Sequence, residues 1–350
     1  MNNHMSITLI GFGIAGQLLL SYILDLVTGY NVTIIDPDFL GGDLIRDYAN
    51  IYTNTTIAQK IKSLEKLPNT WSESINSLRD RGELNDTVLL ADLITDLRKS
   101  SGKLVSQCKC IYDKVKKVSW NEESRVWKLY LDSGSTHTTR IICFCGGMVP
   151  RQDDYGIPII PLSIAMDELR LSRIIKKTHH IIVIGSAHSA TLVLKNLNNI
   201  PGVLVSCLYR GSKPFKYARD NEYSGIKKES ADIADAIEKG TYTNISFIPI
   251  NNIPVISKTI RNADWIIQAN GFTARFPDIF IGDTCITPTW NPQTGLSNEL
   301  PQAQAFGACV PSVTCINNDI YPDISLSSFV DQLEQRWPLL KSTIQNQNLV

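Results

Sequence analysis

One short segment near the N-terminus has the residue types and spacing that bind a pyrophosphate. It reads Gly11-Phe12-Gly13-Ile14-Ala15-Gly16. In this pattern the first glycine permits a tight turn, the second lets phosphates approach the backbone, and the third lets a helix pack on a strand. Asp36 follows 20 residues after Gly16, where a carboxylate can accept hydrogen bonds from a ribose diol. The segment predicts dinucleotide binding; the alternative is a glycine turn with only a structural role.

A second, weaker turn of this kind begins at residue 185 and reads Gly185-Ser186-Ala187-His188-Ser189-Ala190. Ala190 is a permitted variant, but the methyl group of Ala187 lies where phosphates come closest. The next predicted strand ends at Arg210-Gly211-Ser212-Lys213, whose two cations can bind a 2′-phosphate. This predicts an NADPH site, the alternative being a degenerate domain kept for its packing. His188 is either a cofactor contact or a surface residue.

Both glycine turns lie between an apolar strand and an amphipathic helix, the order of a βαβ unit. The pattern predicts helices over 14–28, 86–99 (capped by Asp86), 189–198 and 325–337, and strands over 6–10, 32–35, 112–119, 125–131, 139–145, 181–184, 204–209 and 265–269. The strands at 112–131 alternate as in an antiparallel sheet. We therefore expect an α/β protein with two Rossmann-like domains. Residues 210–240 are polar and receive no assignment.

The composition favours an ordinary globular enzyme with a small-molecule substrate. The 350 residues are 43% hydrophobic, and 34 basic side chains balance 34 acidic ones, which argues against nucleic acid or an anionic membrane as partner. No apolar run reaches the roughly 20 residues of a membrane helix, and the start lacks signal-peptide features. We expect a cytoplasmic protein, and the sequence permits a homo-oligomer. The eight cysteines form no Cys-x-x-Cys pair, so we expect buried reduced thiols and no metal site.

Further segments follow the turns in a fixed order: Gly41-Gly42-Asp43-Leu44, Tyr52-Thr53-Asn54-Thr55, Cys145-Gly146-Gly147 with Pro150, Asp264 through Gly271, and Ala305-Phe306-Gly307. Together they resemble the two-dinucleotide-binding-domain flavoproteins of the thioredoxin-reductase-like superfamily, and most of all the flavin-containing monooxygenases. Leu44 replaces the tryptophan of the family's Gly-Gly-x-Trp segment. The resemblance covers most of the chain.

The resemblance implies an FAD-binding domain made of residues 1–152 and 263–350, with an NADPH-binding domain inserted at 153–262. FAD contacts are then expected at the first turn, Asp36, Gly41, Gly42, Gly147 and Gly307. NADPH contacts are expected at Gly185, Ala187, His188, Ser189, Arg210, Ser212 and Lys213. The chain returns to the FAD domain beside Gly271, which is also expected to contact a cofactor. Asn54 is expected to face the flavin as a catalytic residue, the alternative being an ordinary turn residue.

In this family, NADPH reduces the flavin and a flavin C4a-(hydro)peroxide oxygenates a soft nitrogen or sulfur nucleophile. Two features depart from that pattern: residues 156–177 lack the family's Phe-x-Gly-x-x-x-His fingerprint, and Ala308 replaces the aspartate of the reductases' Gly-Asp motif. The alternatives are a reductase without its own dithiol, which passes electrons to a partner, and a non-catalytic FAD-binding interaction protein.

Overall fold

The short apolar runs form parallel strands in the computed structural model, which describes residues 5–218, 225–316 and 319–347. The chain divides into two units. Unit 1 comprises Met1–Ala49, Thr55–Met148 and Ala274–Val350, and unit 2 comprises Asn50–Asn54 and Val149–Thr273. Each unit contains a parallel sheet with a glycine turn after its central strand, so the predicted fold class is confirmed.

The central sheet of unit 1 has five parallel strands in the order β16-β7-β1-β2-β3. Its strands are β1 (Ile7–Ile10), β2 (Val32–Asp36), β3 (Lys109–Tyr112), β7 (Ile141–Phe144) and β16 (Ala303–Ala305). Strands β1, β2 and β7 are buried along their whole length, because both faces of the sheet are covered. Sheets covered on both faces have such continuous apolar strands.

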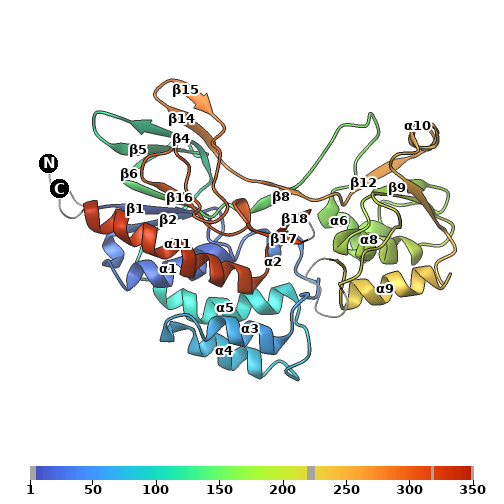
Figure 1. Ribbon diagram of the computed structural model, residues 1–350, viewed down its shortest axis with the longest axis horizontal. Coiled ribbons are helices and arrows are strands. Elements are labelled where there is room, and N and C mark those ends of the chain that lie inside the picture. The colour runs from blue at the N-terminus through green and yellow to red at the C-terminus, as the bar shows by residue number, and fades with distance from the viewer. Residues whose placement is uncertain (1–4, 219–224, 317–318, 348–350) are drawn as a thin grey trace. The chain divides into compact units, whose positions relative to one another are not determined.

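Helices cover one face of this sheet and a second sheet covers the other (Figure 1). Leu9 and Ile34 pack on the helical side, whereas Ile10 and Ile35 pack on the second sheet. The helices are α1 (Ile14–Leu24), α2 (Asp43–Asp47), α3 (Ile57–Leu64), α4 (Ser72–Arg79), α5 (Leu90–Val105) and α11 (Leu326–Gln347). The second sheet contains β4 (Val115–Asn121), β5 (Val126–Leu131), β6 (Thr136–Thr139), β14 (Asp278–Ile281) and β15 (Thr284–Ile286), with β4, β5 and β6 antiparallel as expected.

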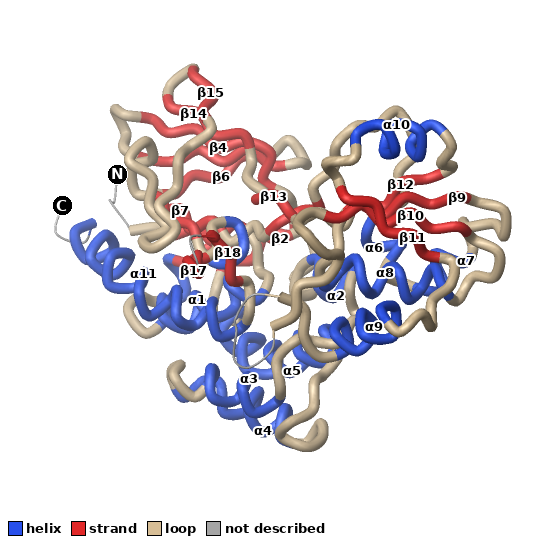
Figure 2. The backbone as a smooth tube through the Cα atoms, turned by 45° about the vertical axis from the view of Figure 1, so that its right-hand side comes forward, coloured by secondary structure: helices blue, strands red, loops and turns tan. Residues whose placement is uncertain are grey.

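Unit 2 repeats the parallel arrangement with four strands in the order β11-β10-β9-β12 (Figure 2). They are β9 (His180–Ile184), β10 (Leu204–Tyr209), β11 (Ile245–Pro249) and β12 (Trp265–Gln268). One face carries α6 (Leu162–Ala165), α7 (Glu168–Ser172), α8 (His188–Asn198) and α9 (Glu229–Glu238), and the other packs on α10 (Ile253–Arg261). The unassigned stretch 210–240 thus contains a helix, α9.

The remaining elements are short. Strands β8 (Met148–Pro150) and β13 (Phe272–Ala274) pair where the chain leaves and re-enters unit 1, and β17 (Ser312–Ile316) pairs antiparallel with β18 (Asp319–Asp323). The 3₁₀ turns are η1 (Gly29–Asn31), η2 (Asn69–Trp71) and η3 (Gly307–Cys309). Among the described residues, no helix is long and apolar enough to cross a membrane, and no three His, Cys, Asp or Glu side chains group as metal ligands.

One predicted helix start is wrong. Helix α5 begins at Leu90 with Leu89 as its N-cap, and it extends to Val105 rather than ending at residue 99. Asp86 does not cap this helix. Its carboxylate instead accepts a hydrogen bond from the N–H of Glu83, at 2.9 Å. The local turn and a helix N-cap compete for the same aspartate side chain, and here the Asp86 carboxylate is already occupied by the N–H of the turn.

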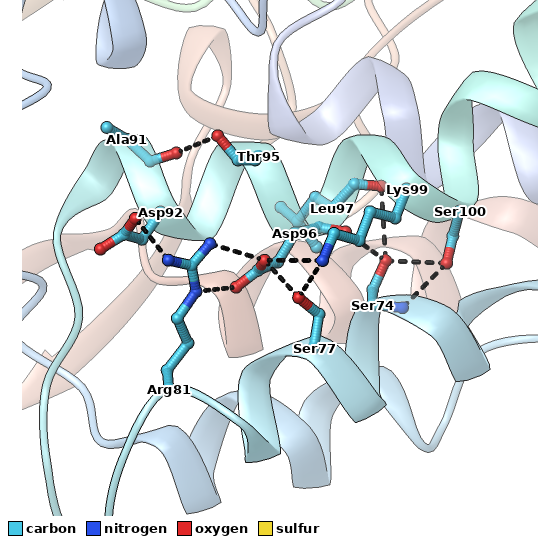
Figure 3. A network of polar contacts seen from close by, with 10 residues as sticks. All are labelled: Ser74, Ser77, Arg81, Ala91, Asp92, Thr95, Asp96, Leu97, Lys99 and Ser100. Atoms are coloured by element: carbon cyan, nitrogen blue, oxygen red, sulfur yellow. Dashed lines mark hydrogen bonds and ion pairs between the residues drawn. The ribbon is translucent and has the colours of Figure 1, made fainter.

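A buried carboxylate joins α4 to α5 (Figure 3). Asp96 has no exposed side-chain surface. The guanidinium of Arg81 donates to both of its oxygens, at 2.9 and 3.0 Å, and Ser77 donates to one at 2.6 Å. Lys99 donates to Ser77 at 2.6 Å. Since a buried charge is tolerated only when it is paired, this network fixes the two helices against each other.

We predict that Arg81→Ala lowers the free energy of unfolding by about 3 kcal/mol, because it removes the paired donors of the buried Asp96 carboxylate and leaves it to the more distant, half-exposed Lys99 ammonium, 3.9 Å away. Arg79→Ala is the matched control. Arg79 pairs with Glu65, and both side chains are about half exposed, so its loss should cost less than about 1 kcal/mol. Urea unfolding of both variants measures the difference, and equal losses would contradict the prediction.

Candidate functional site

The first glycine turn brings three backbone segments into contact at the carboxyl end of β1. Gly11 has φ +96°, and a Cβ there would lie 2.6 Å from the carbonyl oxygen of Cys145. A Cβ on Gly16 would lie 2.4 Å from the carbonyl oxygen of Gly11. Real Cβ atoms do not approach oxygen so closely, so both positions require glycine. Their close contacts hold the start of α1 against the strand ends.

Gly13 differs from these two glycines because the fold itself does not require it. It is the N-cap of α1, with φ −68° and ψ −168°, a conformation that any residue adopts. The nearest atom to a Cβ there is the Gly41 carbonyl oxygen, at an ordinary 3.8 Å. The missing side chain therefore leaves space beside the helix start.

The N-terminus of α1 has no side-chain cap and no acidic residue in its first turn. By contrast, α3 begins with a full capping box, in which Thr56 and Gln59 each accept the other's backbone N–H. The first N–H groups of a helix have no intrahelical partner and carry a partial positive charge. The turn Gly13-Ile14-Ala15-Gly16 thus presents the features that bind anions.

Asp36 links the glycine turn to the chain that follows β2. Its carboxylate is 5% exposed. One oxygen accepts the N–H of Phe12 at 2.7 Å, and the other accepts the N–H groups of Asp38 and Phe39 at 3.1 and 2.8 Å. The ribose contact expected from the sequence stays a prediction. In the structure, these hydrogen bonds also let the Asp36 carboxylate fix the two turns beside it.

The other glycines predicted for unit 1 gather around the same helix start. A Cβ on Gly42 would lie 3.6 Å from the Cα of Gly13, and one on Gly307 would lie 2.3 Å from the Cβ of Ala15. Gly147 follows Cys145-Gly146, which contacts Gly11. Four chain segments that are distant in sequence therefore meet at one end of α1; that these residues contact FAD stays a prediction.

Helix α11 positions the Gly307 segment through two buried polar side chains. The side-chain oxygen of Gln332 accepts the N–H of Gly307 at 2.8 Å. The guanidinium of Arg336, which is fully buried, donates to the carbonyl oxygens of Ala305 and Val310 at 2.8 and 2.9 Å. Burial lowers the pKa of Arg336 to about 10, so it stays charged at neutral pH. Sequence reasoning missed both residues, since neither belongs to a motif.

The turn in unit 2 has the same backbone geometry with fewer glycines. Gly185 has φ +113°, and a Cβ there would lie 2.3 Å from the Ala269 carbonyl oxygen. Ala187 is the exposed N-cap of α8, with φ −96° and ψ −165° and no side-chain cap. Ala190 is fully buried in the hydrophobic core. The N–H groups at the start of α8 are therefore arranged as in α1, with one methyl group beside them.

The remaining predicted residues of unit 2 lie around this turn and the end of β10. The His188 ring accepts the N–H of Lys227 at 3.3 Å, and burial lowers the pKa of His188 to about 4. The imidazole is neutral and has a partner within the protein. Arg210, Ser212 and Lys213 are exposed, and among the described residues neither cation forms an ion pair. Ser189 is half-buried in the first turn of α8, and Gly271, with φ +111°, accepts the N–H of Arg151.

The Thr53-Asn54-Thr55 segment precedes α3, and the Asn54 side chain is exposed. Sequence reasoning missed the lysine that follows it. Lys60 is 1% exposed, and its ammonium group reaches back to donate to the Thr55 carbonyl oxygen. Burial lowers the pKa of Lys60 to about 8. A buried amine at the start of a helix costs stability.

The described cysteines are free thiols. Cys143, Cys145, Cys207 and Cys309 are buried, Cys108 and Cys110 are partly buried, and burial raises the pKa of all six. A raised pKa keeps them as unreactive thiols. The expectation of buried thiols is confirmed for Cys143, Cys145, Cys207 and Cys309, whereas Cys285 is exposed; that the thiols stay reduced remains a prediction.

No protein-family model matches the chain, and no curated protein sequence matches it. Solved structures do match at 12% sequence identity. The flavin-containing monooxygenase from Stenotrophomonas maltophilia superposes with a TM-score of 0.64 over 98% of both chains. The bacillithiol disulfide reductase from Bacillus cereus and the ornithine N-hydroxylase from Kutzneria sp. 744 give 0.61 and 0.60, each over 98% of this chain and 99% of theirs. This chain has the fold of two-domain flavoproteins. The family resemblance seen in the sequence is thereby confirmed at the level of the fold.

Lys60 generates a pH prediction. Its folded pKa is about 8, against a usual 10.5, so the unfolded chain binds more protons between these values. Lys60 should therefore contribute a rise in stability of about 2 kcal/mol between pH 7.5 and 10, set against the fall contributed by the buried thiols, whose pKa values are raised. Lys60→Met should remove this contribution, whereas Lys62→Met, an exposed neighbour on the same helix, should keep the pH dependence of the unmodified protein. Urea unfolding of all three proteins at the two pH values tests this, and an unchanged pH dependence in Lys60→Met would refute it.

Proposed function

We propose that this chain is an oxidoreductase that uses FAD and NADPH. The observation that carries the proposal is that α1 and α8 both begin without a side-chain cap beside a glycine turn at the carboxyl end of a parallel strand. Helix starts of this kind bind phosphates, and open parallel sheets bind ligands at this edge. The choice of cofactors is supported by the Kutzneria ornithine N-hydroxylase, which was solved with reduced FAD, NADP⁺ and L-ornithine.

The residues of unit 1 fit FAD. The space beside Gly13 admits phosphates to the first N–H groups of α1, and the Asp36 carboxylate retains acceptor capacity for a ribose hydroxyl. Gly41, Gly42, Gly147 and Gly307 bring backbone rather than side chains to the same place. Bound FAD would accept hydride from NADPH and pass the electrons on. The protein's part is to hold and orient it.

The residues of unit 2 fit the second dinucleotide. The start of α8, with Gly185 and Ser189, would take the pyrophosphate. Arg210 and Lys213, exposed at the end of β10, would take the 2′-phosphate that distinguishes NADPH from NADH. The methyl group of Ala187 partly blocks the approach of phosphates to the start of α8, so we expect the dinucleotide to bind more weakly here than at the α1 turn.

For the reaction, we propose oxygenation of a soft nitrogen or sulfur nucleophile of a small molecule, with Asn54 as the residue that contacts the flavin. Two of the three similar structures named above are a monooxygenase and an N-hydroxylase, which supports this choice. The second candidate is electron transfer to a disulfide partner. The nearly equal similarity to the bacillithiol disulfide reductase and the missing Phe-x-Gly-x-x-x-His fingerprint favour it.

A product analysis separates these reactions. Protein loaded with FAD is given NADPH, isotopically labelled dioxygen and a set of amines and thioethers. We expect NADPH oxidation with dioxygen uptake and one labelled oxygen atom in the product. NADPH oxidation that consumes added disulfides without dioxygen would instead support the reductase. If NADPH does not bleach the bound flavin, both reactions are excluded.

A pair of glycine variants tests FAD binding in unit 1. Gly13→Ala should fold normally because its Cβ meets only ordinary contacts, yet it should weaken FAD binding at least tenfold, a loss of about 1.4 kcal/mol, by filling the phosphate space. Gly16→Ala should instead destabilise the protein by about 1–3 kcal/mol, because its Cβ meets the Gly11 carbonyl. FAD titration and thermal melting of the apoprotein measure the two effects. Unchanged FAD affinity in Gly13→Ala would count against the proposed site.

The reciprocal change belongs in unit 2. Ala187→Gly removes the methyl group at the matching position and should tighten NADPH binding at least several-fold, with little effect on stability because the conformation is an ordinary one. Isothermal titration with NADP⁺ measures this. If neither the unmodified protein nor Ala187→Gly binds NADP⁺, the second dinucleotide site does not exist.

A further inference from the structure

Arg275 contacts two of the glycine segments around the start of α1. Its backbone N–H donates to the Gly147 carbonyl oxygen at 3.0 Å. Its carbonyl oxygen would lie 2.7 Å from a Cβ on Gly146. Arg275 is thus held by its backbone against the Gly146–Gly147 segment, with no room for a side chain between them.

The side chain of the same residue reaches the second segment. The two terminal nitrogens of Arg275 lie 2.5 and 3.3 Å from the two carboxylate oxygens of Asp43. Paired contacts of this kind fix direction as well as distance. Asp43 directly follows Gly41-Gly42 and is the first residue of α2. That helix has five residues, too few to hold a position by itself.

The tethered turn lies beside the open helix start. A Cβ on Gly42 would lie 3.6 Å from the Cα of Gly13, and Gly13 adjoins the space assigned to the phosphates. Asp36 fixes the preceding residues, Asp38 and Phe39, from the other end. Without Arg275, the Gly41–Gly42 turn would be held from the Asp36 side, by packing and by the more exposed Arg46, which pairs with both Asp38 and Asp43.

We propose that Arg275 is a positioning residue that joins the Gly41–Gly42 turn to the Gly146–Gly147 segment and so sets the width of the dinucleotide site in unit 1. The inference rests on the proposed binding of FAD there. Arg275 acts through Asp43 and through backbone contacts, and it need not touch the cofactor. A lysine offers one point charge in place of the planar pair of donors, so it can replace Arg275 only in part.

The test measures FAD affinity and the visible spectrum of the bound flavin. Arg275→Ala should raise the Kd for FAD at least tenfold and shift or broaden the flavin absorption bands, because the walls of the site become mobile. Arg275→Lys should give an intermediate Kd. Asp43→Ala should resemble Arg275→Ala, and the double variant should be no worse than either single variant, since the two residues act through each other.

Arg46→Ala is the matched control. Arg46 also pairs with Asp43 but is more exposed and makes no described contact with Gly146 or Gly147. Its loss should leave the Kd for FAD within about twofold. If Arg275→Ala does not fold, Arg275→Lys and Asp43→Asn carry the test, and each should weaken binding.

The outcomes separate the inference from the proposed function. Unmodified protein that binds no FAD overturns the function itself. FAD binding with the same Kd and spectrum in the unmodified protein and the Arg275 variants overturns the inference alone. A fall in the melting temperature of the apoprotein without any change in affinity or spectrum also overturns it, because that result describes a merely structural ion pair.

Discussion

The candidate site depends on one backbone contact, between the first glycine after β1 and the end of the neighbouring strand. Gly11 lies so close to the Cys145 carbonyl that a Cβ would come within 2.6 Å of its oxygen. That contact turns the chain sharply, and Gly16 then lets α1 pack on the same turn. The helix start is held at the sheet edge, where Asp36, Gly42 and Gly307 can reach it. A side chain at either glycine would displace the helix and separate these groups.

Unit 2 shows which parts of this arrangement the fold requires. Its first glycine, Gly185, makes the same close contact with the Ala269 carbonyl. The second and third glycine positions are alanines, yet α8 starts with nearly the same backbone angles as α1. Glycine at position 13 is therefore unnecessary for folding. The space beside Gly13 is therefore open to a ligand, and it is there that we propose the phosphates bind.

The sequence predicts what depends on local pattern and misses what depends on long-range side-chain contacts. Apolar runs and glycine spacing predict the two parallel sheets, because burial and close backbone contact leave few residue choices. The helix cap predicted at Asp86 was wrong, because an aspartate side chain accepts hydrogen bonds within a turn as readily as at a helix N-terminus. Arg275 and Arg336 gave no signal, because their partners are carboxylates and carbonyls far away in the chain. Nothing in the local sequence separates such residues from surface arginines.

The buried cysteines near the start of α1 bear on whether this chain could carry out thiol–disulfide chemistry. Cys145 and Cys309 lie in the segments that contact the start of α1, but both are buried and burial raises their pKa values. Thiol–disulfide exchange requires an accessible thiolate, so these residues serve as packing groups. Neither residue therefore supplies the reactive thiol that disulfide reduction requires. An oxygenating enzyme needs no such thiol but needs a fixed site, and the Asp43–Arg275 and Gln332–Gly307 contacts fix two of the segments around the start of α1.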